Sequence, residues 1–266
     1  MIDRQTTFPI GVYDSGIGGI SVLAEIVRLL PNENYIYLAD SANAPYGTKS
    51  YQQVLELSLN AARSLISRDI KALVVACNTA TSVAIEEMRK EFNIPVIGME
   101  PALKPAVETG KNGHIVVMAT PLTLVEEKFV NLYNRYNDKT SIIPVPCPGL
   151  VEIIESEAEP DKIQQYLTDR FKNIKISDIS AVVLGCTHYC FVKNELADVI
   201  GRQKLIVDGN AGTARHLKTT LSSCKLLNDD NKIRTHTGVD YITSGNIERI
   251  IPLCQRFLTK ALNNGD

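Results

Sequence analysis

The chain has 266 residues, of which 44% are hydrophobic and 22% are charged, and its formal net charge is −2. This length is sufficient for two α/β lobes or one large one, and the composition is that of an ordinary soluble globular protein. The slightly negative charge gives no sign of a nucleic-acid partner, and the lack of a long apolar run or a signal-peptide core favours a cytoplasmic protein without a membrane partner.

The first part of the chain alternates between segments typical of strands and segments with helical spacing. The predicted strands are residues 9–13, 35–39, 73–76 and 94–98, and the predicted helices are residues 20–30, 50–68 and 81–91. Ser50 and Gln53 match a capping box at the start of the second of these helices.

A glycine-rich turn, D-S-G-I-G-G at residues 14–19, joins the first strand to the first helix. A dinucleotide-binding fingerprint would require a further glycine at position 21, which is Ser21. Dinucleotide binding is therefore not predicted, but the turn still allows the backbone to approach a small anionic ligand closely.

The rest of the chain repeats this alternation, which predicts an α/β fold with mostly parallel sheets. The predicted strands are residues 114–118, 141–145, 182–185 and 205–208 and a strand from Tyr241; the predicted helices are residues 122–136, 161–172 and 211–218, helices from Leu150 and from about Phe191, and a closing helix. The last segment is expected to pack on the first lobe. This gives a discontinuous first lobe of residues 1–98 and 209–266 and a second lobe of residues 99–208.

Two of the predicted strands end in the same way. Residues 72–79 read A-L-V-V-A-C-N-T and residues 181–188 read A-V-V-L-G-C-T-H, so Cys77 and Cys186 each follow an apolar run directly. Ligands of parallel α/β sheets bind beyond the carboxyl ends of the strands. We therefore expect two pseudo-symmetric α/β lobes whose two thiols face each other across an active site in the cleft between the lobes.

Two thiols on opposite sides of a carbon acid can invert its configuration, because one removes a proton while the other delivers a proton to the opposite face. Asp14 and His188 are the right types of residue to tune the pKa of such thiols. Asn78, Thr79 and Thr187, together with the N-termini of the helices that follow, are suited to binding a carboxylate.

Each of these assignments has an alternative. The cysteines could be small buried residues, Asp14 a turn residue, Asn78 a helix cap and His188 a structural histidine. A Cys–His pair also fits covalent nucleophilic catalysis, and C-T-H-Y-C at residues 186–190 has a spacing that could bind zinc, although no second Cys/His cluster completes a structural site. The other cysteines are expected to be structural thiols: Cys147, Cys190, Cys224 and Cys254.

Four segments together resemble a known family. They are G-V-Y-D-S-G-I-G-G at residues 11–19, A-D and P-Y-G within residues 39–47, A-C-N-T-A at residues 76–80 and G-C-T-H at residues 185–188. In this order they are similar to the cofactor-independent glutamate racemases of the aspartate/glutamate racemase superfamily, over nearly the whole chain. The resemblance implies that Cys77 and Cys186 are the proton donor and acceptor, without a metal ion, pyridoxal phosphate or other cofactor.

The resemblance also implies the supporting residues. The family's Gly-Thr-x-x-Thr segment is Ala119-Thr120-Pro-Leu-Thr123 here, with alanine in place of glycine. The family glutamate after the Cys-Pro segment matches Glu155, whereas Glu152 stands where a proline is common. The supporting acid–base residues are Asp14, Glu155 and His188. The substrate-binding residues are Asp14, Ser15, Tyr46, Gly47, Asn78, Thr79, Thr120, Thr123, Thr187 and His188.

By this resemblance, the chain is expected to interconvert L- and D-glutamate in a bacterial cytoplasm and to supply D-glutamate for peptidoglycan synthesis. The alternatives are a racemase of aspartate or another amino-acid-like carbon acid, and a non-catalytic two-lobed protein that binds dicarboxylates. Loss of one cysteine would favour the binding protein, and this sequence keeps both. Glutamate is the expected partner, and a homodimer is one assembly that the sequence leaves open.

Overall fold

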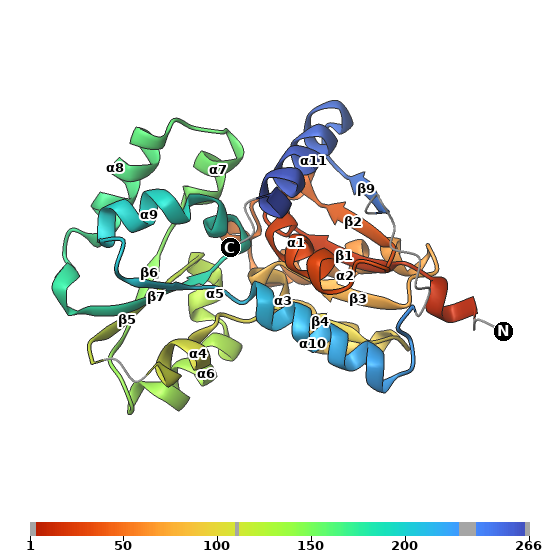
Figure 1. Ribbon diagram of the computed structural model, residues 1–266, viewed down its shortest axis with the longest axis horizontal. Helices are drawn as coiled ribbons and strands as arrows, with labels where there is room; N and C mark the ends of the chain where they lie inside the picture. Colours follow the sequence, from red (N-terminus) through yellow and green to blue (C-terminus); the bar gives the residue numbers. More distant parts are fainter. Residues whose placement is uncertain (1–3, 110–111, 229–237, 264–266) are drawn as a thin grey trace.

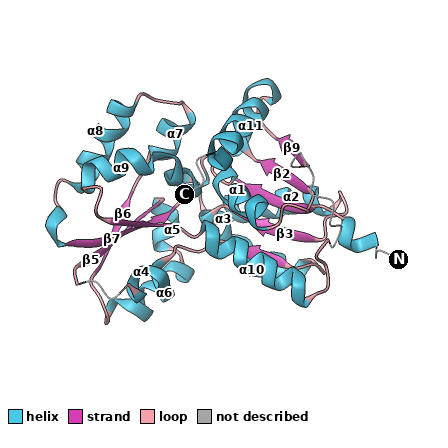
Figure 2. Cartoon of the chain, in the orientation of Figure 1, coloured by secondary structure: helices cyan, strands magenta, loops and turns pink. Residues whose placement is uncertain are grey.

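The structure is a computed structural model that describes residues 4–109, 112–228 and 238–263. Two α/β lobes lie side by side (Figure 1), and each is built on one sheet with helices on both faces (Figure 2). Every strand pairing among these residues is parallel. The predicted fold class, two α/β lobes with parallel sheets, is therefore confirmed.

The sheet of the first lobe has the strand order β4-β3-β1-β2-β9. Its strands are β1 (Ile10–Asp14), β2 (Tyr35–Ala39), β3 (Ala72–Val75), β4 (Val96–Gly98) and β9 (Val239–Thr243). The side chains of β2 alternate between two hydrophobic cores, one on each face of the sheet, as expected for a strand buried on both faces. The last strand, β9, pairs with β2, so the C-terminal part of the chain returns to the first sheet.

Five helices cover this sheet. On one face lie α1 (Ile20–Leu29), α10 (Asn210–Ser223) and α11 (Ile247–Asn263); on the other lie α2 (Tyr51–Ile66) and α3 (Asn78–Glu91). The predicted capping box is present, because the Ser50 hydroxyl accepts from the Gln53 amide while the Gln53 side chain accepts from the Ser50 amide. Short 3₁₀ turns complete the lobe: η1 (Arg4–Thr7), η2 (Ser41–Asn43) and η3 (Tyr46–Thr48).

The sheet of the second lobe has the strand order β6-β5-β7-β8. Its strands are β5 (His114–Ala119), β6 (Ile142–Pro146), β7 (Ile179–Gly185) and β8 (Leu205–Val207). On one face lie α7 (Leu150–Glu155), α8 (Pro160–Phe171), α9 (Lys193–Ile200) and the 3₁₀ turns η4 (Ile176–Asp178) and η5 (Thr187–Val192). On the other lie α4 (Leu103–Glu108) and α6 (Glu127–Asn137), with α5 (Pro121–Val125) beside them.

Parts of the helix prediction are wrong in detail. The predicted helix over residues 122–136 is two helices, because Glu126 is extended between α5 and α6. This break turns Thr120 and Thr123 toward Thr79 of the first lobe while Phe129 of α6 packs on the second sheet. The helix expected near Phe191 begins at Lys193 after the η5 turn, and α4 is an additional short helix in a segment predicted to be a connection.

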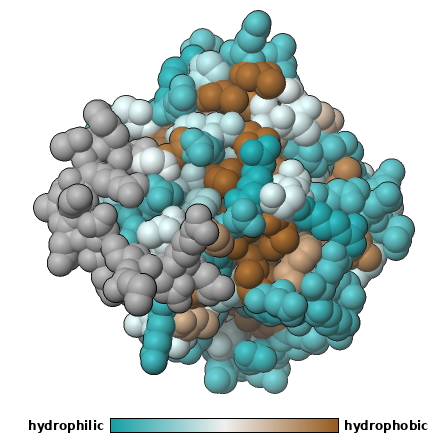
Figure 3. Space-filling view, turned by 90° about the vertical axis from the view of Figure 1, so that its right-hand side faces the viewer, coloured by the Kyte–Doolittle hydropathy of each residue, from teal (hydrophilic) through white to brown (hydrophobic). Residues whose placement is uncertain are grey.

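The chain crosses between the sheets twice, after β4 and after β8, which brings the carboxyl ends of the two sheets together. The termini and residues 229–237 of the predicted first lobe lie outside the described residues. The face of the first lobe that points away from the second is mostly hydrophilic with smaller hydrophobic areas (Figure 3), as on an ordinary protein surface. Among the described residues, no helix combines the length and the apolar character that a membrane span requires.

Candidate active site

Loops from the carboxyl ends of both sheets enclose one cavity between the lobes. Its volume is about 10 Å³, room for about one water molecule, so an amino-acid-sized molecule enters only if the loops or lobes move apart. The cavity is lined by Ser15, Pro45, Tyr46, Gly47, Cys77, Asn78, Thr79, Thr120, Val151, Cys186, Thr187 and His188.

Ten of the predicted site residues are therefore in the cavity wall, and the other three lie directly behind it. Asp14 accepts from the Thr187 hydroxyl, Glu155 contacts the His188 ring, and Thr123 contacts Thr120. Two lining residues were not singled out from the sequence. Pro45 belongs to the quoted P-Y-G motif, and Val151 lies four residues before Glu155, which is the spacing of one helix face.

Cys77 stands at the junction of β3 and α3, where its thiol caps the helix. The sulfur accepts from the Ala80 amide at 3.4 Å and donates to the Ser15 hydroxyl at 3.5 Å. This cap explains why α3 begins at Asn78 and not at residue 81 as predicted. Burial, reinforced by the Asp14 carboxylate, raises the pKa of Cys77 to about 12. Cys77 is therefore a neutral thiol near neutral pH.

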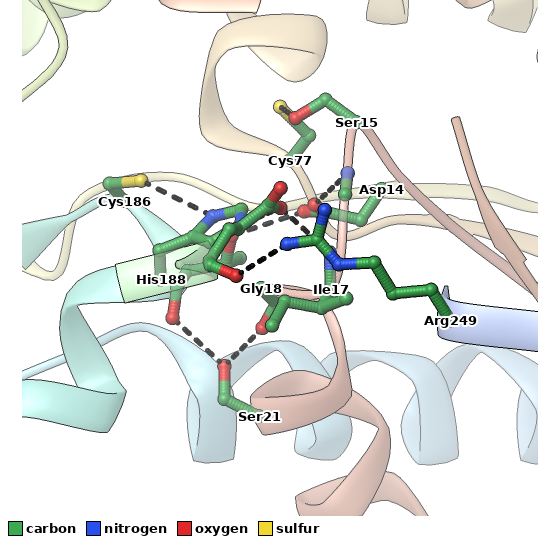
Figure 4. A network of polar contacts seen from close by, with 12 residues as sticks. Asp14, Ser15, Ile17, Gly18, Ser21, Cys77, Cys186, His188 and Arg249 are labelled. Carbon is green, nitrogen blue, oxygen red and sulfur yellow. Dashed lines mark hydrogen bonds and ion pairs between the residues drawn. The ribbon is translucent and has the colours of Figure 1, made fainter. Parts of the chain in front are cut away.

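Cys186 has a different partner. Its sulfur lies 4.0 Å from Nδ1 of His188 (Figure 4). Nε2 of the same ring donates to Oε1 of Glu155 at 2.8 Å. Burial favours a neutral imidazole, but Cys186 and Glu155 outweigh it and raise the pKa of His188 well above its ordinary value. A protonated His188 therefore lies between the Cys186 sulfur and the Glu155 carboxylate.

Glu155 is in turn held from the first lobe. Its carboxylate accepts from the Ile17 amide at 3.3 Å, and its backbone carbonyl accepts from Arg249 of α11 at 3.2 Å. Burial raises the pKa of Glu155, but the contacts with His188 and these neighbours lower it overall. Arg249 was not found from the sequence, because nothing in its local pattern connects it with a residue of the other lobe.

Asp14 connects the two halves of the site. The carboxylate accepts from the Gly16 amide at 2.9 Å and from the Thr187 hydroxyl at 3.1 Å. Full burial raises the pKa of Asp14, while His188 and these two hydrogen bonds favour its ionised form. Asp14 thus raises the pKa of the Cys77 thiol and fixes the residue that follows Cys186.

The glycine turn is in direct contact with the second lobe. A Cβ atom on Gly18 would lie 2.3 Å from Nδ1 of His188, and one on Gly16 would lie 2.2 Å from Oε1 of Glu155. Gly47 lies equally close to the other lobe, since a Cβ there would be 2.5 Å from Cβ of Thr120. Glycine fits these positions because the backbone itself packs against side chains of the second lobe.

Buried polar side chains from both lobes lie beside the thiols. Both side-chain atoms of Asn78 are buried and make no hydrogen bond with the described residues. Thr79, Thr120 and Thr123 form a closed triangle of hydroxyls, with contacts of 2.9 to 3.1 Å, that joins the two lobes. Such amide and hydroxyl groups can exchange these contacts for those of a bound carboxylate or ammonium group.

Tyr46 is positioned by a network behind the cavity. Its hydroxyl donates to the buried Asp40 carboxylate at 2.6 Å, and Asp40 also accepts from Ser244 and Asn43.

Among the residues that the structure describes, no group of three or more His, Cys, Asp or Glu side chains is arranged to hold a metal ion, and C-T-H-Y-C at residues 186–190 forms no such group.

The geometry defines a class of protein. It is a two-lobed α/β protein in which each lobe brings one thiol from the end of an equivalent strand into a shared cavity, and the two thiols have separate polar partners. The chain belongs to the Asp/Glu/hydantoin racemase family, whose sequence profile matches residues 10–217.

Named relatives agree with this family. The chain is 52% identical to the glutamate racemase of Clostridium acetobutylicum over 253 residues, which are 94% of this chain and 97% of that protein. It is similar to the structure of Escherichia coli glutamate racemase in complex with L-glutamate and the activator UDP-MurNAc-ala, with 30% identity, a TM-score of 0.81 and coverage of 94% and 95% of the two chains. The structure of glutamate racemase from Francisella tularensis in complex with D-glutamate has 27% identity, a TM-score of 0.81 and coverage of 96% and 94%.

Proposed function

We propose that this protein is a glutamate racemase that interconverts L- and D-glutamate without a cofactor, with Cys77 and Cys186 as the two acid–base groups. The observation that carries the proposal is that both thiols line the same closed cavity. Relatives of the same family with this activity, including proteins crystallised with either enantiomer of glutamate, support the choice of substrate.

In the proposed reaction, the Cys186 thiolate, stabilised by protonated His188, removes the Cα proton of one enantiomer. The Cα–H bond breaks and an S–H bond forms, and the electron pair is delocalised into the substrate carboxylate. The neutral Cys77 thiol then delivers its proton to the opposite face of Cα, which breaks its S–H bond and forms the new Cα–H bond. The centre is inverted and no atom is oxidised or reduced. In the reverse direction the two thiols exchange roles.

The remaining wall of the cavity suits an amino acid with two carboxylates. The unpartnered Asn78 amide and the hydroxyls of Thr79 and Thr187 are proposed to bind the carboxylate next to Cα, beside the N-terminus of α3. Ser15, Tyr46 and the neighbouring glycine turn are proposed to contact the rest of the substrate. Ala119 stands where the family has glycine. The Thr120 and Thr123 hydroxyls that follow it nevertheless contact the Thr79 hydroxyl beside the cavity.

The direct test is formation of D-glutamate from L-glutamate by purified protein that has been treated with a chelator and supplied with no cofactor, followed by chiral chromatography. Cys77→Ser and Cys186→Ser should each abolish racemisation in both directions, since a hydroxyl is too weakly acidic to replace the thiol. Cys254→Ser is a matched control, because Cys254 is also buried but lies in α11 and does not line the cavity.

The same assay separates the alternatives. Faster racemisation of aspartate than of glutamate would assign the scaffold to another substrate, and tight binding without racemisation would indicate a dicarboxylate-binding protein. From the family resemblance we also propose that the protein works in the cytoplasm and supplies D-glutamate for peptidoglycan synthesis. Assembly into a homodimer stays a prediction that analytical ultracentrifugation tests.

A further inference from the structure

Ser21 occupies the position at which the glycine turn departs from a dinucleotide-binding fingerprint, and its hydroxyl contacts both lobes. The side chain is buried in the first turn of α1. Its Oγ donates to the Gly18 carbonyl at 2.9 Å (Figure 4). The same Oγ lies 3.3 Å from the Thr187 carbonyl of the second lobe. A helical serine often bonds a carbonyl in the preceding turn, but the contact with Thr187 extends beyond the helix.

The Thr187 carbonyl belongs to the peptide group that joins Thr187 to His188. Its orientation therefore determines where the imidazole ring lies relative to Cys186 on one side and Glu155 on the other. The Thr187 hydroxyl is fixed separately by Asp14. The two hydrogen bonds hold this residue from the first lobe by its backbone and by its side chain.

Gly18 completes the same contact. Its Cα lies against both Thr187 and His188, because a Cβ at Gly18 would be 2.4 Å from Oγ1 of Thr187 and 2.3 Å from Nδ1 of His188. The single Ser21 hydroxyl proton is thus shared between the Gly18 carbonyl at 2.9 Å and the Thr187 carbonyl at 3.3 Å. One hydroxyl sets the spacing between the two backbones.

We propose that Ser21 is a positioning residue for the Cys186–His188 pair, because its hydroxyl fixes the peptide that carries His188 against the glycine turn of the other lobe. The inference rests on the proposed racemase function and adds a residue that does not line the cavity. Removal of the hydroxyl is therefore expected to lower kcat more than it raises KM.

The test compares Ser21→Ala with Ser180→Ala. Ser180 is a matched control, since it is a buried serine whose hydroxyl donates to a backbone carbonyl, that of His114, at 3.0 Å, but it lies at the far end of β7 from Cys186. In Ser21→Ala we expect kcat to fall about two- to tenfold with little change in KM, since one hydrogen bond is lost. The kcat/KM values must fall equally in both directions because the substrates are enantiomers. Ser180→Ala should keep both constants.

Two further measurements make the outcome decisive. Ser21→Thr restores the hydroxyl, and the adjoining cleft of about 360 Å³ has room for its methyl group, so kcat should return to within about twofold of the wild type. Hydrogen–deuterium exchange on substrate-free protein should show faster exchange in the segment of residues 187–192 for Ser21→Ala but not for Ser180→Ala.

An active wild type with equal behaviour of the two alanine variants in kinetics and exchange would overturn the positioning role, as would failure of Ser21→Thr to restore kcat. A wild type that does not racemise glutamate would instead refute the proposed function. The exchange measurement still reports on the contact in that case, because it does not depend on turnover.

Discussion

The substitution Gly18→Ala tests whether the backbone of the first lobe must approach the histidine of the second. The new Cβ would lie 2.3 Å from Nδ1 of His188, about 1.1 Å short of the 3.4 Å at which ordinary contacts begin. The imidazole ring of His188 cannot move away without losing a contact, because Nε2 is hydrogen-bonded to Glu155 at 2.8 Å and Nδ1 lies 4.0 Å from the Cys186 sulfur. Either the ring moves by about 1 Å or the lobes separate.

A displacement of about 1 Å at a catalytic group typically costs about 100-fold in rate, and overpacking of a buried site destabilises a protein by about 1–3 kcal/mol. We therefore expect kcat/KM of Gly18→Ala to fall about 100-fold, equally in both directions, with a lower free energy of unfolding. Racemisation is followed by circular dichroism at a fixed protein concentration, and stability by urea denaturation.

Gly212→Ala is the matched control. Gly212 lies inside α10 with open space around its Cα, so alanine there should leave kcat/KM unchanged and raise the free energy of unfolding by about 0.5–1 kcal/mol through its higher helix propensity. If Gly18→Ala kept kcat/KM within about twofold of the wild type, the close contact between the glycine turn and His188 would be wrong.

Three further predictions concern ionisation and buried polar contacts. The pKa of His188 is raised in the folded protein, so the stability that protonated His188 contributes is fully present below the ordinary imidazole pKa and is lost as the pH rises through the folded pKa. His188→Asn should flatten this decline of the free energy of unfolding, measured by urea denaturation from pH 6 to 9. An unchanged pH dependence would refute the charged pair of His188 and Glu155. Lys71 donates to Glu33 at 2.5 Å, and this almost fully buried pair lies at the amino ends of β3 and β2, away from the cavity. Lys71→Met should therefore lower the free energy of unfolding by about 3–5 kcal/mol, while kcat at a temperature where the variant is folded stays that of the wild type; a loss below about 1 kcal/mol would contradict this. Tyr46→Phe leaves the buried Asp40 with one donor fewer and should cost about 1–3 kcal/mol of stability and raise KM for glutamate, whereas unchanged KM would remove Tyr46 from the substrate site.

Much of the scaffold follows from local patterns in the sequence. The strand predicted at residues 35–39 is β2 with the same limits, and all five of its residues are buried. Cys77 and Cys186 were both placed at carboxyl ends of strands by their matching apolar runs, and both thiols reach one cavity. Strand ends in parallel sheets are predictable because the apolar run and the polar residue that follows it are adjacent in the chain.

Contacts between the lobes were beyond local patterns. Glu155 and Ile17 are 138 positions apart, and no periodicity links a helix of one lobe to a turn of the other. The resemblance to a family, and not spacing, placed Glu155 near the site. The extended residue Glu126 that separates α5 from α6 follows from tertiary demands, since both helical segments have acceptable propensity but must face different partners.

Solvent isotope incorporation tests the central claim, that separate thiols serve the two faces of Cα. Protiated L-glutamate is incubated with the enzyme in deuterium oxide. The two enantiomers are separated early in the reaction, and the deuterium content of each is measured by mass spectrometry. With one thiol as the base and the other as a solvent-exchanged acid, the D-glutamate formed should carry deuterium at Cα while the remaining L-glutamate stays protiated. D-glutamate that retains most of the original protium would show that one group moves the same proton from face to face, and it would contradict the two-thiol account.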